Sequence, residues 1–171
     1  MIQIYTGDGK GKTTGAVGSA IRCAGIGKRV LFCQFLKDGS SGECNLLKTL
    51  SGVDCLLADK EFGFTFQMDE NTTKEAMAYY RDYWEQIEEK MRLKAYDMVI
   101  LDEICDAGAT NMVDVEKVAD FLDKYGKLAE IIMTGRKPAE AFVKKADYIT
   151  EMKKIKHPFD HGLSAREGIE F

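Results

Sequence analysis

The sequence predicts an α/β fold in which helices cover both faces of a mostly parallel sheet. Short apolar runs alternate along the chain with longer amphipathic stretches, which is the pattern of parallel strands joined by helices. Two prolines are the only ones in the chain, and no linker, low-complexity stretch or internal repeat divides it. The length of 171 residues is that of one ordinary domain, so we expect a single domain over residues 1–171.

The first part of the chain begins with a strand and a helix. Residues 2–5 form a short apolar run, and residues 12–25 form a helical stretch that is rich in small residues and ends at Gly25. Residues 30–36 and 53–58 are two further apolar runs. Their length and composition indicate strands that are buried inside the sheet.

The longest helical pattern covers residues 69–94, which are charged on one side and apolar on the other. The remaining expected elements are strands at residues 97–102, 129–134 and 147–152 and helices at residues 114–125 and 138–145. Residues 153–171 are polar and contain glycine, and we expect them to form a loop packed on the surface near the functional site.

The charge and the cysteine content argue against several classes of protein. Asp and Glu number 28 and Lys and Arg number 24, so the net charge of −4 does not favour nucleic acid or an anionic membrane as a partner. No apolar run approaches the length of a membrane span, and the N-terminus lacks the pattern of a signal peptide. The five cysteines contain no C-x-x-C pair, which favours buried free thiols in a reducing compartment. We therefore expect a cytoplasmic protein.

A glycine-rich loop between the first strand and the first helix is the strongest functional signal. Residues 6–14 read TGDGKGKTT and match the end of the phosphate-loop pattern G-x-x-x-x-G-K-[ST], with Thr6 in place of the first glycine. The glycines allow successive amides to turn toward an anion, and the helix N-terminus favours negative charge. Lys12 supplies a full positive charge, and Thr13 offers a hydroxyl to Mg²⁺. The residues expected to contact the nucleotide here are Gly7, Asp8, Gly9, Lys10, Gly11, Lys12, Thr13 and Thr14.

An acid pair follows another buried strand. Four apolar residues precede Asp102 and Glu103, which places both carboxylates at the edge of the sheet where ligands of open α/β folds bind. One carboxylate can hold Mg²⁺ or its waters opposite Thr13. Lys37 and Arg136 also follow strands at this edge, and we expect both to contact the nucleotide. The motifs together predict a magnesium-nucleotide site on a P-loop NTPase-like (RecA-like) three-layer fold, but they leave the reaction open.

Over nearly its whole length the chain resembles the P-loop type of ATP:cob(I)alamin (corrinoid) adenosyltransferase. Beyond the phosphate loop, the matching segments are residues 30–37, 42–43, 45–47, 63–66, 101–103, 134–136, 146–147, 156–162 and 168–171. The resemblance implies transfer of the 5′-deoxyadenosyl group of ATP to the Co(I) of cobalamin or a corrinoid precursor, with release of triphosphate. It implies that Lys12 and Glu103 are catalytic, and that Thr13, Glu103 and Asp102 hold Mg²⁺, Asp102 directly or through water.

The resemblance also assigns a role to Phe64 and Phe66. They would contact the corrinoid and form an apolar wall that displaces the lower ligand of cobalt, which makes reduction to Co(I) easier. From the residues alone, two phenylalanines on either side of Thr65 are more typical of the core of a strand. The family further implies a homodimer and an electron donor such as a reduced flavoprotein. Relatives often carry a basic helix before the first strand, whereas this sequence begins with the strand.

Two other functions remain open from the sequence. Asp8 within the loop and the altered segment at residues 106–112 are compatible with a module that binds ATP and a corrinoid without catalysis. The phosphate loop alone is also compatible with a phosphotransferase or an NTPase, which would release ADP. The identity of the phosphate product distinguishes these functions.

Overall fold

The computed structural model describes residues 1–60, 62–63 and 67–170. Within these residues one sheet has the strand order β3-β2-β4-β5-β1-β6, and all neighbouring strands are parallel. The strands are Ile2–Thr6 (β1), Val30–Gln34 (β2), Val53–Leu57 (β3), Met98–Asp102 (β4), Glu130–Thr134 (β5) and Tyr148–Glu151 (β6). All six predicted strands are confirmed, and the sheet is parallel throughout.

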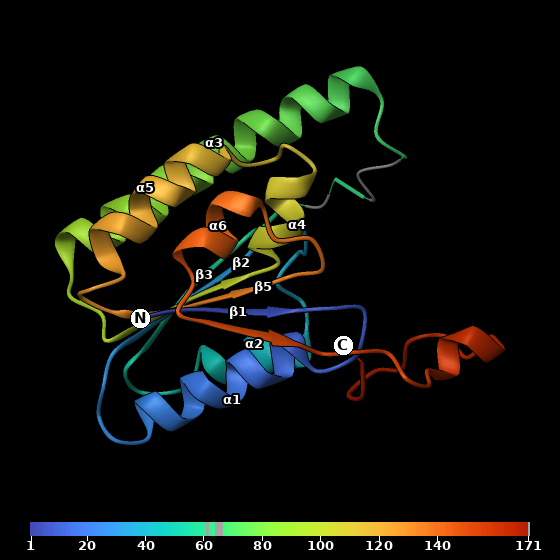
Figure 1. Ribbon diagram of the computed structural model, residues 1–171, viewed down its shortest axis with the longest axis horizontal. Coiled ribbons are helices and arrows are strands. Elements are labelled where there is room, and N and C mark those ends of the chain that lie inside the picture. Colours follow the sequence, from blue (N-terminus) through green and yellow to red (C-terminus); the bar gives the residue numbers. More distant parts are fainter. Residues whose placement is uncertain (61, 64–66, 171) are drawn as a thin grey trace.

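Helices cover both faces of this sheet, so the predicted three layers are confirmed (Figure 1). Helices α1 (Lys12–Ala24) and α2 (Gly42–Leu47) lie on one face. The other face carries α3 (Glu70–Leu93), α4 (Ile104–Ala109), α5 (Val115–Tyr125) and α6 (Glu140–Lys145). The sequence did not predict the short helices α2 and α4, whereas the equally short α6 was predicted at residues 138–145.

Two hydrophobic cores join the three layers, and β2 contributes to both. Val30 and Phe32 belong to the core on the α1 side, whereas Leu31 and Cys33 belong to the core on the α3 side. Because successive side chains of a strand point to opposite faces, a strand covered on both faces must be apolar at nearly every position. Its last residue, Gln34, is polar and also fully buried, and it belongs to the functional edge described below.

The thiols agree with the sequence prediction. Cys23, Cys33, Cys44 and Cys105 are buried, Cys55 is half-buried, and all five are free. In the part of the chain that the structure describes, no helix combines the length and the apolar character that crossing a membrane requires.

The C-terminal segment differs from its prediction. Residues 153–170 extend away from the sheet after β6 and contain a 3₁₀ helix, Pro158–His161 (Figure 1). Ile155 and Phe159 are 91% and 70% exposed, so this part of the segment does not pack on the surface. The prediction of a packed loop is therefore wrong for it, although both ends of the segment contact the phosphate loop.

Candidate functional site

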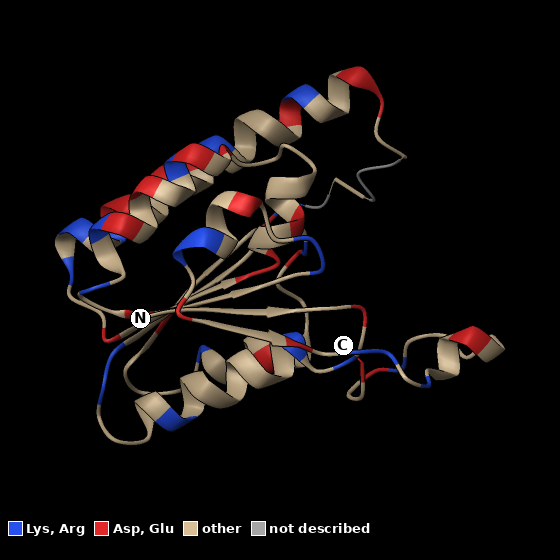
Figure 2. Cartoon of the chain, in the orientation of Figure 1, with Lys and Arg blue, Asp and Glu red and all other residues tan. Residues whose placement is uncertain are grey.

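The C-terminal ends of the parallel strands meet at one edge of the sheet, where charged loops gather (Figure 2). The phosphate loop connects β1 to α1 at this edge. Gly11 is the N-cap of α1 and makes no side-chain capping bond. The first-turn amides of a 13-residue helix therefore have no side-chain cap, which is the arrangement that binds an anion.

The loop is also fixed by the neighbouring strand β6. The Met152 amide donates to the Thr6 carbonyl at 2.8 Å, and the Gly9 amide donates to the Met152 carbonyl at 2.6 Å. A Cβ atom at Gly7 or Gly9 would lie 2.5 Å from the Met152 carbonyl oxygen. The Met152 carbonyl, directly after β6, therefore requires glycine at both positions, independently of any bound phosphate. The sequence motif did not indicate this second requirement.

Two cationic residues, Lys12 and Arg136, lie at this loop. The Lys12 ammonium donates to the Gly9 carbonyl at 2.9 Å. Burial, followed by the positive charge of Arg136, lowers the pKa of Lys12. Within residues 1–60, 62–63 and 67–170, no ion pair is formed by either side chain. Like charges held together at a helix N-terminus without a paired carboxylate favour the binding of a polyanion.

The backbone of Arg136 is fixed by α4. Its amide donates to Asp106 Oδ2 at 2.7 Å, and its carbonyl accepts from the Thr6 hydroxyl at 3.2 Å. Gly135 allows this contact, because its φ of +140° belongs to a region that residues with a side chain rarely adopt. A Cβ atom at this position would lie 2.6 Å from Asp106 Oδ2.

We predict that Gly135→Ala lowers the free energy of unfolding by about 2 kcal/mol and weakens ATP binding, because it strains the backbone before Arg136. Gly18→Ala is the matched control, since Gly18 lies inside α1 with open space around its Cβ position. That control should stabilise the protein by about 0.5–1 kcal/mol. Urea unfolding and calorimetric titration with ATP measure both quantities, and unchanged ATP binding in Gly135→Ala would contradict the prediction.

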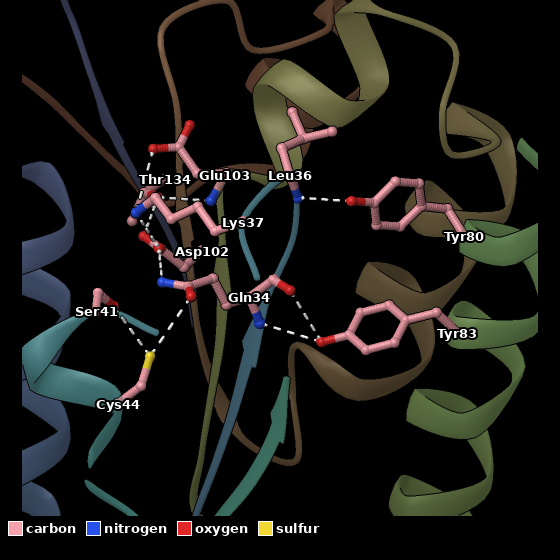
Figure 3. A network of polar contacts seen from close by, with 10 residues as sticks. All are labelled: Gln34, Leu36, Lys37, Ser41, Cys44, Tyr80, Tyr83, Asp102, Glu103 and Thr134. Atoms are coloured by element: carbon pink, nitrogen blue, oxygen red, sulfur yellow. Dashed lines mark hydrogen bonds and ion pairs between the residues drawn. The ribbon is translucent and has the colours of Figure 1, made fainter. Parts of the chain in front are cut away.

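The acid pair forms a connected network with residues of β2 and β5 (Figure 3). Asp102 is fully buried, and its Oδ1 accepts from the Thr134 hydroxyl at 2.7 Å. Its Oδ2 accepts from Gln34 Nε2 at 3.0 Å and from Lys37 Nζ at 3.1 Å. Both oxygens of Asp102 are therefore engaged by the chain itself.

Glu103 is more accessible than Asp102 and lies in an unusual backbone conformation. Its φ of 63° is left-handed, and its amide donates to the Thr134 hydroxyl at 2.9 Å. The Glu103 carboxylate lies 3.7 Å from Lys37 Nζ. Burial, and next the negative charge of Asp102, raise the pKa of Glu103 to about 7. A carboxyl group in this environment gains from a cation bound beside it.

Two tyrosines of α3 hold the chain that carries Lys37 (Figure 3). Leu36 has a φ of 56°, and its amide donates to the Tyr80 hydroxyl at 3.0 Å. The Tyr83 hydroxyl accepts from the Gln34 amide at 3.2 Å and donates to the Leu56 carbonyl at 2.6 Å. The predicted strand at residues 30–36 is thus two residues too long, because the chain turns sharply after Gln34.

Lys37 forms ion pairs with both residues of the acid pair. Burial disfavours its charge, but Asp102 and Glu103 outweigh burial and raise the pKa of Lys37. A contact between Lys37 and a nucleotide stays a prediction, because the ammonium already has two carboxylate partners.

Two residues of the phosphate loop face the C-terminal segment. Asp8 accepts a hydrogen bond from the Lys154 amide at 3.2 Å, and this bond lowers the pKa of Asp8. Lys10 donates to the Ile169 carbonyl and lies 3.9 Å from the Glu170 carboxylate. Their predicted contacts with a nucleotide would therefore compete with contacts inside the chain.

Several residues of the site were not found from the sequence. Thr134, Gln34, Tyr80, Tyr83 and Asp106 all position predicted site residues. The available signal was a glutamine at the end of the apolar run VLFCQ, since a polar residue inside a buried strand needs a partner. Phe64 and Phe66 lie outside the described residues.

Known proteins resemble this chain over its whole length. A family model described as ATP:corrinoid adenosyltransferase BtuR/CobO/CobP matches residues 1–171. The corrinoid adenosyltransferase of a Sinorhizobium species is 35% identical over 173 residues, which cover 100% of this chain and 80% of that protein. The corrinoid adenosyltransferase of Escherichia coli strain K12 is 34% identical over 172 residues, which cover 100% of this chain and 85% of that protein.

A solved structure supports the P-loop NTPase-like fold. EssC (ATPases 2 and 3) from Geobacillus thermodenitrificans matches with a TM-score of 0.51 and 16% identity. The match covers 98% of this chain and about a third, 34%, of the EssC chain. At this identity the likeness bears on the fold alone.

Proposed function

Because the chain belongs to the ATP:corrinoid adenosyltransferase family, we propose that it transfers the 5′-deoxyadenosyl group of ATP to the Co(I) of a corrinoid. The observation on this chain that carries the proposal is the placement of Lys12 and Arg136 beside the uncapped N-terminus of α1, where Lys12 donates to the Gly9 carbonyl and the Arg136 carbonyl accepts from Thr6. A triphosphate is a polyanion that can neutralise both cations at once. The acid pair lies at the same edge of the sheet, after β4.

The reaction balances as a single displacement. The electron pair of Co(I) forms the bond to C5′ of the ribose, and the C5′–O bond breaks with its electron pair going to triphosphate. Negative charge therefore gathers on the leaving group. Lys12, Arg136 and the amides of α1 would stabilise that charge. Such electrostatic stabilisation of a developing anion is usually the largest single contribution to the rate acceleration.

Mg²⁺ is part of the proposal, and the residues present fit it. In nucleotide sites this ion takes one or two carboxylates, substrate phosphates and water. The Glu103 carboxylate, whose pKa is raised to about 7 by burial and by Asp102, and the Thr13 hydroxyl would hold the ion. When bound, Mg²⁺ would neutralise charge on the triphosphate. Asp102 would act through a water molecule or by positioning Lys37, since both of its oxygens are engaged.

We further propose that the protein acts as a cytoplasmic homodimer and receives an electron from a donor such as a reduced flavoprotein. Phe64 and Phe66 would contact the corrinoid and displace the lower ligand of Co(II). A Co(II) centre without that ligand accepts an electron more easily. These two side chains would therefore accelerate the reduction of cobalt and not the transfer of the adenosyl group.

Phe64→Ala is therefore predicted to separate the two steps. Transfer to chemically reduced cob(I)alamin should stay within about twofold of the native rate, whereas transfer that starts from cob(II)alamin and a protein reductant should slow by about tenfold or more. Both rates can be followed anaerobically in the corrinoid absorption spectrum. Equal losses in the two assays would contradict the role of the wall.

The test of the proposed function is one anaerobic incubation with Mg-ATP and cob(I)alamin. A light-sensitive adenosylated corrinoid and one equivalent of triphosphate are expected, and EDTA should stop both. Release of ADP would indicate a phosphotransferase or an NTPase. Bound but intact ATP with an unchanged corrinoid would indicate a binding module, and either result would refute the proposal.

A further inference from the structure

A large cavity lies between α3 and the chain that joins α4 to α5, and Tyr80 is the site residue that lines it. Its volume is about 630 Å³, which is within the range of small-molecule sites. On the α3 side it is lined by Met77, Tyr80 and Trp84, and on the opposite side by Met112 and Val113.

The floor of this cavity suits an aromatic group. Trp84 and Met112 are only 3% and 4% exposed, whereas Met77 is 43% exposed. Methionine side chains adapt to irregular shapes and make favourable contacts with aromatic rings. The indole N–H of Trp84 is buried without a hydrogen-bond partner among the described residues, and such a donor gains from any acceptor that reaches it.

The rim of the cavity carries more positive than negative charge. Lys74, Arg81 and Lys117 line it, and Asp114 is the acidic residue among the lining side chains. Asp114 is occupied as the N-cap of α5, where it accepts from the amides of Glu116 and Lys117 at 3.0 and 3.4 Å. Lys74 pairs closely with Glu70 at 2.6 Å, whereas Arg81 contacts its neighbour Asp82 only at 3.4 Å, so Arg81 and Lys117 are the cations more open to an anionic ligand.

Tyr80 connects this cavity to the site. It lines both the large cavity and a smaller one of about 90 Å³, whose other lining residues include Leu36 and Lys37. The Tyr80 hydroxyl holds the Leu36 amide beside the acid network. A ligand bound near Lys37 could therefore extend an arm past Tyr80 into the large cavity.

We propose that the large cavity receives the nucleotide loop of a complete corrinoid, with its aromatic base on the apolar floor and its phosphate near Arg81 and Lys117. This inference rests on the proposed function and specifies its substrate class. The loop of a complete corrinoid consists of a phosphate, a ribose and a benzimidazole, whereas cobinamide has the same ring and lacks all three. Because Co(I) holds no lower ligand, the base of cob(I)alamin is free to enter such a cavity.

The test compares cob(I)alamin with cob(I)inamide in the native protein and in the double variant Arg81→Glu/Lys117→Glu. Both side chains are exposed, so the variant should fold. The KM for cob(I)alamin should rise about tenfold, since two attractive charges become repulsive, while the KM for cob(I)inamide should stay within about twofold. Arg92→Glu/Lys124→Glu is the matched control, because it makes the same charge change on exposed positions of the same two helices outside the cavity.

Three results would overturn the proposal. Equal changes for both corrinoids would mean that the cavity acts on the ring or on the fold, and no change for either would mean that the loop does not bind there. A change in oligomeric state, measured by analytical ultracentrifugation, would identify the cavity as an interface between two copies of the chain. Equilibrium binding of the two corrinoids reports on the cavity even if no transfer occurs, so failure of the proposed function is distinguishable.

Discussion

Replacing Lys12 with methionine should abolish adenosyl transfer while leaving the free protein at least as stable as the native one. In the absence of a ligand, the Lys12 charge is opposed by burial and by the nearby charge of Arg136, and both lower the pKa of Lys12. Methionine keeps most of the length of the side chain and removes this repulsion. The ammonium is required only when a triphosphate is present, so stability and activity should change in opposite directions.

The expected loss in kcat/KM for ATP is about three orders of magnitude, which is typical of removing a group that stabilises a developing anion. Calorimetric titration with ATP and urea unfolding without ATP measure the two halves of the prediction. Arg22→Met is the control, because Arg22 lies in the last turn of the same helix and is exposed. A Lys12→Met protein that is clearly less stable than the native one would show that the lysine supports the fold instead.

The order of strands and helices could be read from the sequence because the central strands β2, β4 and β5 contain continuous apolar runs. The helices α2, between β2 and β3, and α4, between β4 and α5, were not predicted, and each is only six residues long. The path of residues 153–170 also could not be predicted. Its polar composition suggests a surface loop, but only the structure reveals that Ile155 and Phe159 remain exposed.

The phosphate loop and the acid pair were predictable because each motif is contiguous in the sequence. The network around Asp102 was not, because it depends on which strands are neighbours. Gln34 lies opposite Asp102 only because β2 pairs with β4, and Thr134 reaches the acids only because β5 pairs with β4 on the other side. The local sequence does not show which strands are neighbours in the sheet.

The same dependence on strand order explains how Lys37 acquires its partners. The sequence indicates only that a lysine follows an apolar run, which suggests a direct contact with the nucleotide. In the folded chain Lys37 lies 3.1 Å from Asp102 and 3.7 Å from Glu103. Its contribution to the reaction is therefore better tested through Asp102 than by changing the lysine alone.

Asp102→Ala should be among the most destabilising single substitutions in this chain. Asp102 is fully buried and accepts from Gln34, Thr134 and Lys37. Removing it leaves three donors without their acceptor, one of them a partly buried ammonium. Loss of one partner of a buried ion pair lowers the free energy of unfolding by about 3–5 kcal/mol.

Asp102→Asn should lower the free energy of unfolding by less than Asp102→Ala does. Its side-chain carbonyl can still accept from the Thr134 hydroxyl, although its amide faces the other donors. Asp54→Ala is the matched control, since Asp54 pairs with Lys94 and Tyr96 but its side chain is 34% exposed. The control should lower the unfolding free energy by less, about 1 kcal/mol, because the Asp54 carboxylate keeps contact with water, whereas Asp102 is fully buried. Urea unfolding of the three variants would contradict this account if Asp102→Ala and Asp54→Ala were equally destabilised, since burial of the Asp102 network would then make no difference.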